Sequence, residues 1–178
     1  KIILLFLIKQ KIMIIDKNTF DNIEKEDQMH QMNYCYFLYP ELKEFLIENN
    51  TFTDIKDTAI QILDKSKGIV KDNKVFNVEG NGVYCHNSFV DLQNNEISNL
   101  TFPAIAISSR CKASLFGNKI ANIKYSGICV RHAKEVKIVE SEIDEINESG
   151  ISISDTESCF VENNKISNCQ ITGIEAYN

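Results

Sequence analysis

The side chains best suited to chemistry in this chain are His86, Arg131, His132 and Asp155. His132 and Asp155 stand 23 residues apart, and a histidine oriented by a carboxylate is a general acid–base pair. The alternative is a solvated surface pair that contributes little. Cys129, close to Arg131 and His132, could serve as a nucleophile. No oxyanion-hole motif accompanies it, and chance adjacency explains its position as well.

Aromatic side chains near these positions indicate binding rather than catalysis. Tyr84, His86 and Tyr177 could stack on the rings of a sugar, and Arg131 adds a cation beside them. A protein ligand could use the same side chains. We therefore treat Tyr84, His86, Arg131 and Tyr177 as candidate binding residues.

The six cysteines point to structural thiols. They include no Cys-x-x-Cys pair, and no histidine stands at zinc-ligand spacing beside them, so we predict neither a metal site nor a cofactor. Cys85, Cys159 and Cys169 fall at inward positions, where a free cysteine behaves as a small hydrophobe, which favours a reducing, cytoplasmic compartment. The sequons at Asn49, Asn99 and Asn147 argue the other way, although an Asn-rich chain makes them by chance.

Charge and hydropathy exclude two classes of partner. The net charge is −6, and lysines are interleaved with acids, so the chain offers no basic field for nucleic acid. The apolar run at residues 2–8 is too short to span a bilayer. It is either the hydrophobic region of a signal peptide or a strand or cap that closes one end of the fold.

The elements that must position these side chains belong to a repeat. A small residue recurs at intervals of 22 or 23 residues, at Ala59, Gly82, Ala104, Gly127, Gly150 and Gly173. A fixed period in this range is typical of a solenoid. We also expect this small residue to permit a tight turn into the strand that follows it.

Apolar residues recur at the same places in every unit. The reference position is occupied by Asn50, Asn73, Asn95, Asn118, Ser141 and Asn164. Five and three places before it, and two, five, ten and twelve places after it, no unit has a charged or amide side chain. Apolar pairs two apart, such as Val136 and Ile138, indicate short strands. Each unit re-enters one period later, so equivalent strands must run parallel and stack.

The reference asparagines predict a structural ladder. Side-chain amides of Asn50, Asn73, Asn95, Asn118 and Asn164 could bond to one another from unit to unit. Asparagine also tolerates left-handed backbone, so we expect a sharp turn here. A second polar column, four places after the reference position, supports the same coiling: Asp54, Asn77, Asn99, Asn122, Glu145 and Asn168.

The pattern Asn-x-Ile-x-Asn followed four residues later by Gly-Ile-x-Ile resembles the repeat of right-handed parallel β-helix proteins with the pectin-lyase-like fold. The resemblance implies an all-β solenoid of about 23 residues per rung and six to seven rungs, regular over residues 42–178. Residues 1–41 would form an N-terminal cap or a degenerate first rung with an inserted loop, from Glu24 to Met32, that carries His30. A leucine-rich repeat is the alternative fold, but the place eight before the asparagine is not consistently apolar.

The resemblance specifies the fold better than the function. Proteins with such repeats include polysaccharide lyases and glycoside hydrolases, as well as subunits of ubiquitin ligases and SH2-domain-binding proteins. The lyases use a basic residue with calcium-binding acids, and inverting hydrolases need paired carboxylates. The outward position of the third strand offers a single acid, in the series Gln61, Tyr84, Ala106, Cys129, Ser152 and Glu175.

The sequence therefore favours a non-catalytic recognition or scaffold module of a larger protein, with a protein or polysaccharide ligand. A polysaccharide lyase or glycoside hydrolase is the alternative. The last repeat ends at Asn178 without a capping segment, so we expect additional chain or a cap at that end.

Overall fold

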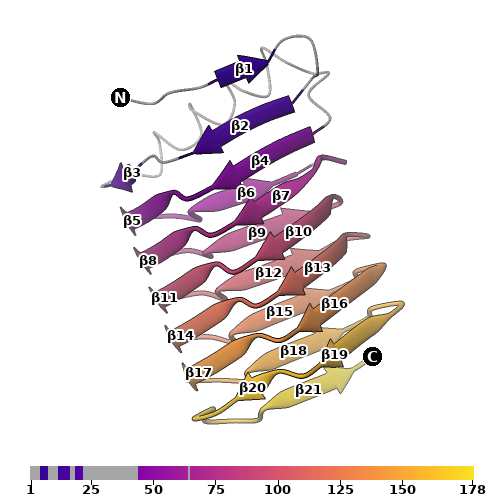
Figure 1. Ribbon diagram of the computed structural model, residues 1–178. Coiled ribbons are helices and arrows are strands. Elements are labelled where there is room, and N and C mark those ends of the chain that lie inside the picture. The colour runs from indigo at the N-terminus through magenta and orange to yellow at the C-terminus, as the bar shows by residue number, and fades with distance from the viewer. Residues whose placement is uncertain (1–4, 8–11, 17–18, 22–43, 64) are drawn as a thin grey trace.

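The fold is a coil of β-strands. A computed structural model describes residues 5–7, 12–16, 19–21, 44–63 and 65–178, and these residues form 21 strands and no helix. The strands lie in three sheets that run the length of the molecule (Figure 1). Short strands of five residues or fewer suit a chain rich in Ile and Val with a turn every few residues.

Sheet A has eight strands. Its first strand, β1 (Leu5–Leu7), is antiparallel to β2, and all the other pairings in the sheet are parallel. The remaining strands are β2 (Ile12–Asp16), β4 (Glu44–Glu48), β7 (Lys67–Lys71), β10 (Phe89–Gln93), β13 (Lys112–Phe116), β16 (Glu135–Val139) and β19 (Cys159–Glu162).

Sheets B and C are parallel throughout. Sheet B contains β3 (Thr19–Asp21), β5 (Thr51–Ile55), β8 (Lys74–Val78), β11 (Glu96–Leu100), β14 (Lys119–Ile123), β17 (Glu142–Ile146) and β20 (Lys165–Ile166). Sheet C contains β6 (Ile60–Ile62), β9 (Val83–His86), β12 (Ile105–Ser108), β15 (Ile128–Arg131), β18 (Ile151–Ser154) and β21 (Ile174–Tyr177).

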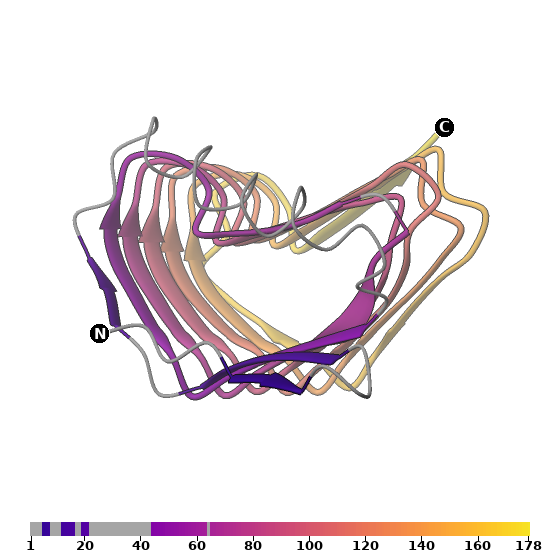
Figure 2. The same ribbon diagram turned by 90° about the horizontal axis from the view of Figure 1, so that it is seen from above.

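Each rung visits the three sheets in the order A, B, C. Seen from the N-terminal end, the chain runs clockwise as it recedes, so the coil is right-handed (Figure 2). Equivalent residues pair from rung to rung, as Ile105, Ile128, Ile151 and Ile174 do along sheet C. The predicted parallel β-helix is thus confirmed. The leucine-rich alternative is wrong, because the positions after the small residue form a third parallel sheet.

Most of the predicted apolar positions fill the interior, whereas Ile174 of the last rung is 48% exposed. Leu92, Leu115 and Ile138 lie one above another and are fully buried, and Ile97 and Ile120 are nearly so. Burying one such side chain stabilises a protein by about 1.5–3 kcal/mol relative to leaving it exposed. Stacking like on like therefore supplies most of the stability of the coil and leaves only the outer faces for binding.

The stacked asparagine ladder is confirmed at the turn between sheets A and B. The Nδ2 of Asn95 donates to Oδ1 of Asn118 at 2.9 Å and to the carbonyl of Val70 at 2.9 Å. Its own Oδ1 accepts from Nδ2 of Asn73 at 3.0 Å. Ser141 interrupts the series, since its hydroxyl bonds within its own rung to the carbonyl of Val139.

The expectation that the ladder residues themselves adopt left-handed backbone is wrong. Positive φ falls on the residue before each of them: Asn49, Asp72, Asn94, Gly117, Glu140 and Asn163. The polar column four residues after the ladder does adopt positive φ, as expected: Asp54, Asn77, Asn99, Asn122, Glu145 and Asn168. The reversal is made by the exposed preceding residue because the ladder side chain must point inward to reach the next rung.

The small residue before sheet C also has a different role from the one expected. Gly82, Gly127, Gly150 and Gly173 do not adopt positive φ, which among the described glycines occurs at Gly117 alone. A Cβ added to Gly127 would stand 2.7 Å from the carbonyl oxygen of Gly150 on the next rung. Small residues occupy this column because the backbones of neighbouring rungs approach closely there.

An earlier, longer turn of the coil precedes the regular rungs. Ile12 pairs with Glu44, and Thr19 pairs with Thr51, so this turn is offset by 32 residues. The inserted loop from Glu24 to Met32, with His30, lies outside the described residues. No helix in the described ranges is long and apolar enough to cross a bilayer.

Candidate functional site

The candidate side chains gather on the outer face of sheet C and at the turn that follows it. The last position of successive sheet C strands is occupied in register by His86, Ser108, Arg131, Ser154 and Tyr177. The loops that lead from sheet B into sheet C lie beside this face (Figure 2). A ligand on sheet C would therefore meet both the strand ends and these loops.

Three polar groups form a cluster on β9 and β12. The hydroxyl of Tyr84 lies 3.4 Å from Nδ1 of His86, which lies 3.2 Å from Oγ of Ser108. The Ser108 hydroxyl is also 3.2 Å from the Tyr84 oxygen and 3.2 Å from the carbonyl of Cys85. All three side chains are partly exposed. Two hydroxyls and one imidazole retain donors and acceptors for the hydroxyl groups of a ligand.

Arg131 and two aromatic residues form a second cluster, two rungs beyond Tyr84 and His86. The Cys129 sulfur, when ionised, and a hydrogen bond with Tyr125 raise the pKa of the Arg131 guanidinium, which is charged at physiological pH even without them. Tyr125 stacks on Phe102 of the previous loop, with ring centroids 6.4 Å apart and planes inclined by 21°. The pair places aromatic surface next to a cation, a combination that binds flat or ring-shaped groups.

Sequence reasoning missed Phe102 and Tyr125. They occupy the same place in consecutive units, seven residues after Asn95 and Asn118. The recurrence of an aromatic residue at the same loop position of adjacent rungs could have identified them as candidate binding residues. Ser108 was missed as well, although it stands directly between His86 and Arg131 in the strand-end column.

Cys129 does not lie open on the outer face as expected. It is only 6% exposed, and its thiol interacts with Arg131 and lies within the electrostatic influence of Glu148 and Glu175. Burial raises the pKa of the thiol, and Arg131 offsets this only in part. The thiolate is therefore scarce at neutral pH, which counts against a role as nucleophile.

His132 and Asp155 come together at the turn between sheets C and A. Nδ1 of His132 lies 3.8 Å from Oδ2 of Asp155, and the side chains are 68% and 48% exposed. Both residues adopt left-handed backbone. They border a hollow of about 460 Å³ together with His86, Arg110 and Glu157. The separation is long for a hydrogen bond, and a pair this exposed contributes little to stability.

The remaining candidates share a column without touching. His86, Arg131 and Tyr177 are each two rungs from the next, which is about 10 Å at the spacing of parallel strands. They cannot bind one small group, but they can contact successive units of an extended chain. Among the described residues, no three His, Cys, Asp or Glu side chains converge as a metal site would require.

Comparison with known proteins agrees with this architecture. The family described as "Right handed beta helix region" matches residues 4–125 and, in a second match, residues 89–178. No curated protein and no solved structure shows significant similarity to the chain. Since the matches cover nearly all of the sequence and the three parallel sheets wind as that description requires, the chain belongs to the right-handed β-helix family.

Proposed function

We propose that this protein is a non-catalytic recognition module that holds an extended polysaccharide along the outer face of sheet C. The observation that carries the proposal is the cluster of Tyr84, His86 and Ser108 in line with Arg131 along one column. Hydroxyl and imidazole groups beside aromatic rings suit the alternating polar edges and apolar faces of sugars.

The stiffness of the coil favours binding of a long ligand. Rungs repeat about every 4.8 Å, so groups on sheet C stand at fixed intervals before the ligand arrives. Preorganised groups lose little side-chain freedom on binding. A polymer with a regular repeat can use several of them at once, whereas an isolated sugar would use only one or two.

Affinity electrophoresis through gels that contain neutral or acidic polysaccharides tests the proposal. We expect retardation of the wild-type protein in at least one gel, and a several-fold weaker effect for Tyr84→Ala and Arg131→Ala. Phe76→Ala is the matched control, since Phe76 is a partly exposed aromatic on sheet B of the same rung as Tyr84. Equal retardation of all variants, or binding only to a protein ligand, would refute a polysaccharide site on sheet C.

A carbohydrate-active enzyme is the second candidate, on the strength of the His132–Asp155 contact. In that case His132 would exchange a proton with the ligand, and Asp155 would orient the imidazole ring of His132. Release of reducing ends or of unsaturated sugars by the wild-type protein, abolished in His132→Ala and in Asp155→Asn, would favour this activity over simple binding.

A further inference from the structure

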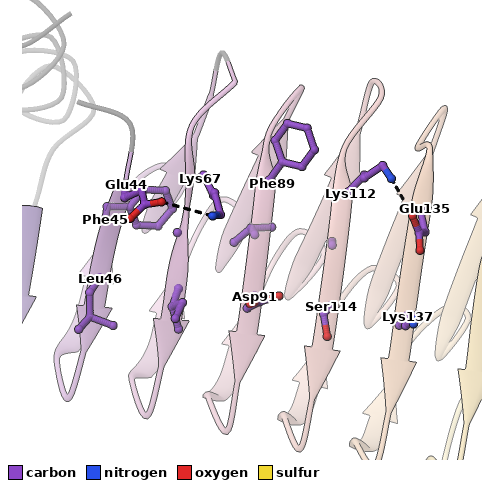
Figure 3. Close-up of a pocket in the computed structure, with 14 residues that line it drawn as sticks. Glu44, Phe45, Leu46, Lys67, Phe89, Asp91, Lys112, Ser114, Glu135 and Lys137 are labelled. Carbon is purple, nitrogen blue, oxygen red and sulfur yellow. Dashed lines mark hydrogen bonds and ion pairs between the residues drawn. The ribbon is translucent and has the colours of Figure 1, made fainter. Parts of the chain in front are cut away.

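The outer face of sheet A carries a second surface, on the other side of the turn that holds His132 and Asp155. A shallow hollow of about 670 Å³ crosses β4, β7, β10, β13 and β16 (Figure 3). The middle positions of successive strands form a row in register across it and onto β19: Leu46, Ile69, Asp91, Ser114, Lys137 and Phe160. We call these six residues the middle row.

Neither charge of the middle row is in an ion pair within the described part of one molecule, although Lys137 acts electrostatically on Glu135. Asp91 and Lys137 are both exposed and stand on either side of Ser114, one rung away in each direction. Two rungs separate the carboxylate from the ammonium, about 10 Å. Within the described part of the chain no ion pair joins Asp91 to a cation, and Lys137 lies over the ring of Phe160 at 5.9 Å.

The row is, however, complementary to itself when reversed. If a second copy packs face to face with its coil axis reversed and Ser114 opposite Ser114, then Asp91 meets Lys137 of the second copy, and the reverse contact forms too. Ile69 meets Phe160 in the same arrangement. At the end of the strands, Phe116, which is 42% exposed, meets Phe116 of the second copy.

Other alignments lose this match. Centring the axis on Asp91 sets two carboxylates against each other. If one copy instead slides by one rung along the other, Asp91 and Lys137 each lie opposite Ser114 or an apolar residue of the second copy. A parallel arrangement places Asp91 on Asp91 and Lys137 on Lys137. In the favoured alignment one like-charged contact arises, between the two Lys112 residues, and each of these lysines is paired with its own Glu135 at 2.9 Å.

We propose that the outer face of sheet A is a self-association surface, on which two copies pack as an antiparallel twofold dimer centred on Ser114. Five rungs of five-residue strands cover roughly 400 Å² per copy at ordinary strand dimensions. This is below the roughly 800 Å² per partner typical of stable complexes. We therefore expect a weak dimer, with a Kd on the order of 0.1 mM, which salt weakens further.

Sedimentation equilibrium from about 10 μM to 1 mM protein tests the dimer. Asp91→Lys and Lys137→Asp should each raise the Kd at least tenfold, because both Asp91–Lys137 contacts of every dimer would become like-charged. The double variant Asp91→Lys/Lys137→Asp should restore the wild-type value to within about threefold, since the pair is re-formed with its signs exchanged. Phe160→Ser tests the apolar contact without changing the net charge, although it also removes the ring over which Lys137 lies.

The matched control is Glu142→Lys, an exposed charge reversal on sheet B, which should leave the Kd unchanged. Far-UV circular dichroism verifies that each variant keeps its β-structure. A wild-type protein that stays monomeric to 1 mM would overturn the proposal. So would association that none of the sheet A variants weakens, or a double variant no better than the single ones.

Discussion

Replacement of Asn95 by alanine tests the ladder that holds the turn between sheets A and B. The Asn95 side chain takes part in four hydrogen bonds. It donates to the carbonyl of Val70 and to Asn118, and it accepts from the backbone N–H and the side chain of Asn73. Asn95 and both neighbouring ladder residues are at most 1% exposed, so these bonds are shielded from bulk water.

The expected loss follows from that count. A typical hydrogen bond contributes about 1 kcal/mol net, and an orphaned buried group costs about 1–3 kcal/mol. Asn73 keeps its bonds to the carbonyls of Ile47 and Lys71, which limits the damage. We expect Asn95→Ala to lower the free energy of unfolding by roughly 2–4 kcal/mol. The melting temperature should fall by roughly 5–15 °C.

Urea unfolding and hydrogen exchange measure this loss. Stacked repeats can unfold in parts. Exchange at the Asn73 amide, which donates to Oδ1 of Asn95, should therefore accelerate more than exchange at the Ile151 amide, which lies two rungs from Asn95. Glu96→Ala, next to Asn95 but exposed, should change stability by less than about 0.5 kcal/mol. An Asn95→Ala variant as stable as Glu96→Ala would refute the reasoning.

The interrupted rung supplies the converse test. Ser141 is fully buried in the ladder position, yet its hydroxyl bonds only to the carbonyl of Val139 in the same rung. Ser141→Asn can extend the amide series from Asn118 to Asn164, so we expect a gain of about 1 kcal/mol in unfolding free energy. A loss of stability would mean that the rung cannot hold the larger side chain.

Three further predictions follow from packing and burial. Gly127→Ala should destabilise by roughly 1–3 kcal/mol, because its Cβ would meet the carbonyl of Gly150 at 2.7 Å, whereas Gly173→Ala, with its nearest atom at 3.9 Å, should be nearly neutral in the same urea titration. Ile128→Ala removes a fully buried side chain and should cost about 2–5 kcal/mol in thermal unfolding, unless the neighbouring rungs collapse into the cavity. Burial raises the pKa of Cys159 from 9.0 to about 11, so its alkylation, followed by mass spectrometry, should increase up to pH 11 rather than level off near pH 9. The same shift stabilises the fold below pH 9 and is lost as pH rises toward 11.

The fold could be predicted because the spacing of apolar residues along the sequence determines it. A column of Ile, Val and Leu at constant spacing can be buried only if equivalent residues stack, and the observed pairing of Ile128 with Ile151 follows directly. Backbone detail could not be predicted in this way. Whether Asn94 or Asn95 adopts left-handed backbone depends on which side chain must face inward, and the two residue types are identical.

The candidate site was predictable only along the strands. His132 and Asp155 stand at equivalent positions, so their contact follows from the repeat. The loop residues Phe102 and Tyr125 fall outside the regular apolar pattern, and the sequence does not reveal that their loops lie beside sheet C. The burial of Cys129 could not be predicted either. Strand alternation distinguishes only the two faces of a sheet and does not show which side chains cover the outer face.

Methyl NMR on protein labelled at isoleucine tests the central claim most directly. The three-sheet coil stacks Ile105, Ile128, Ile151 and Ile174 in one column, each paired with the next, and the first three are fully buried. We expect strong NOEs between the methyl groups of each consecutive pair, and none between Ile105 and Ile174. The absence of the consecutive NOEs would contradict the stacked rungs, and with them the assignment of every outward-facing residue.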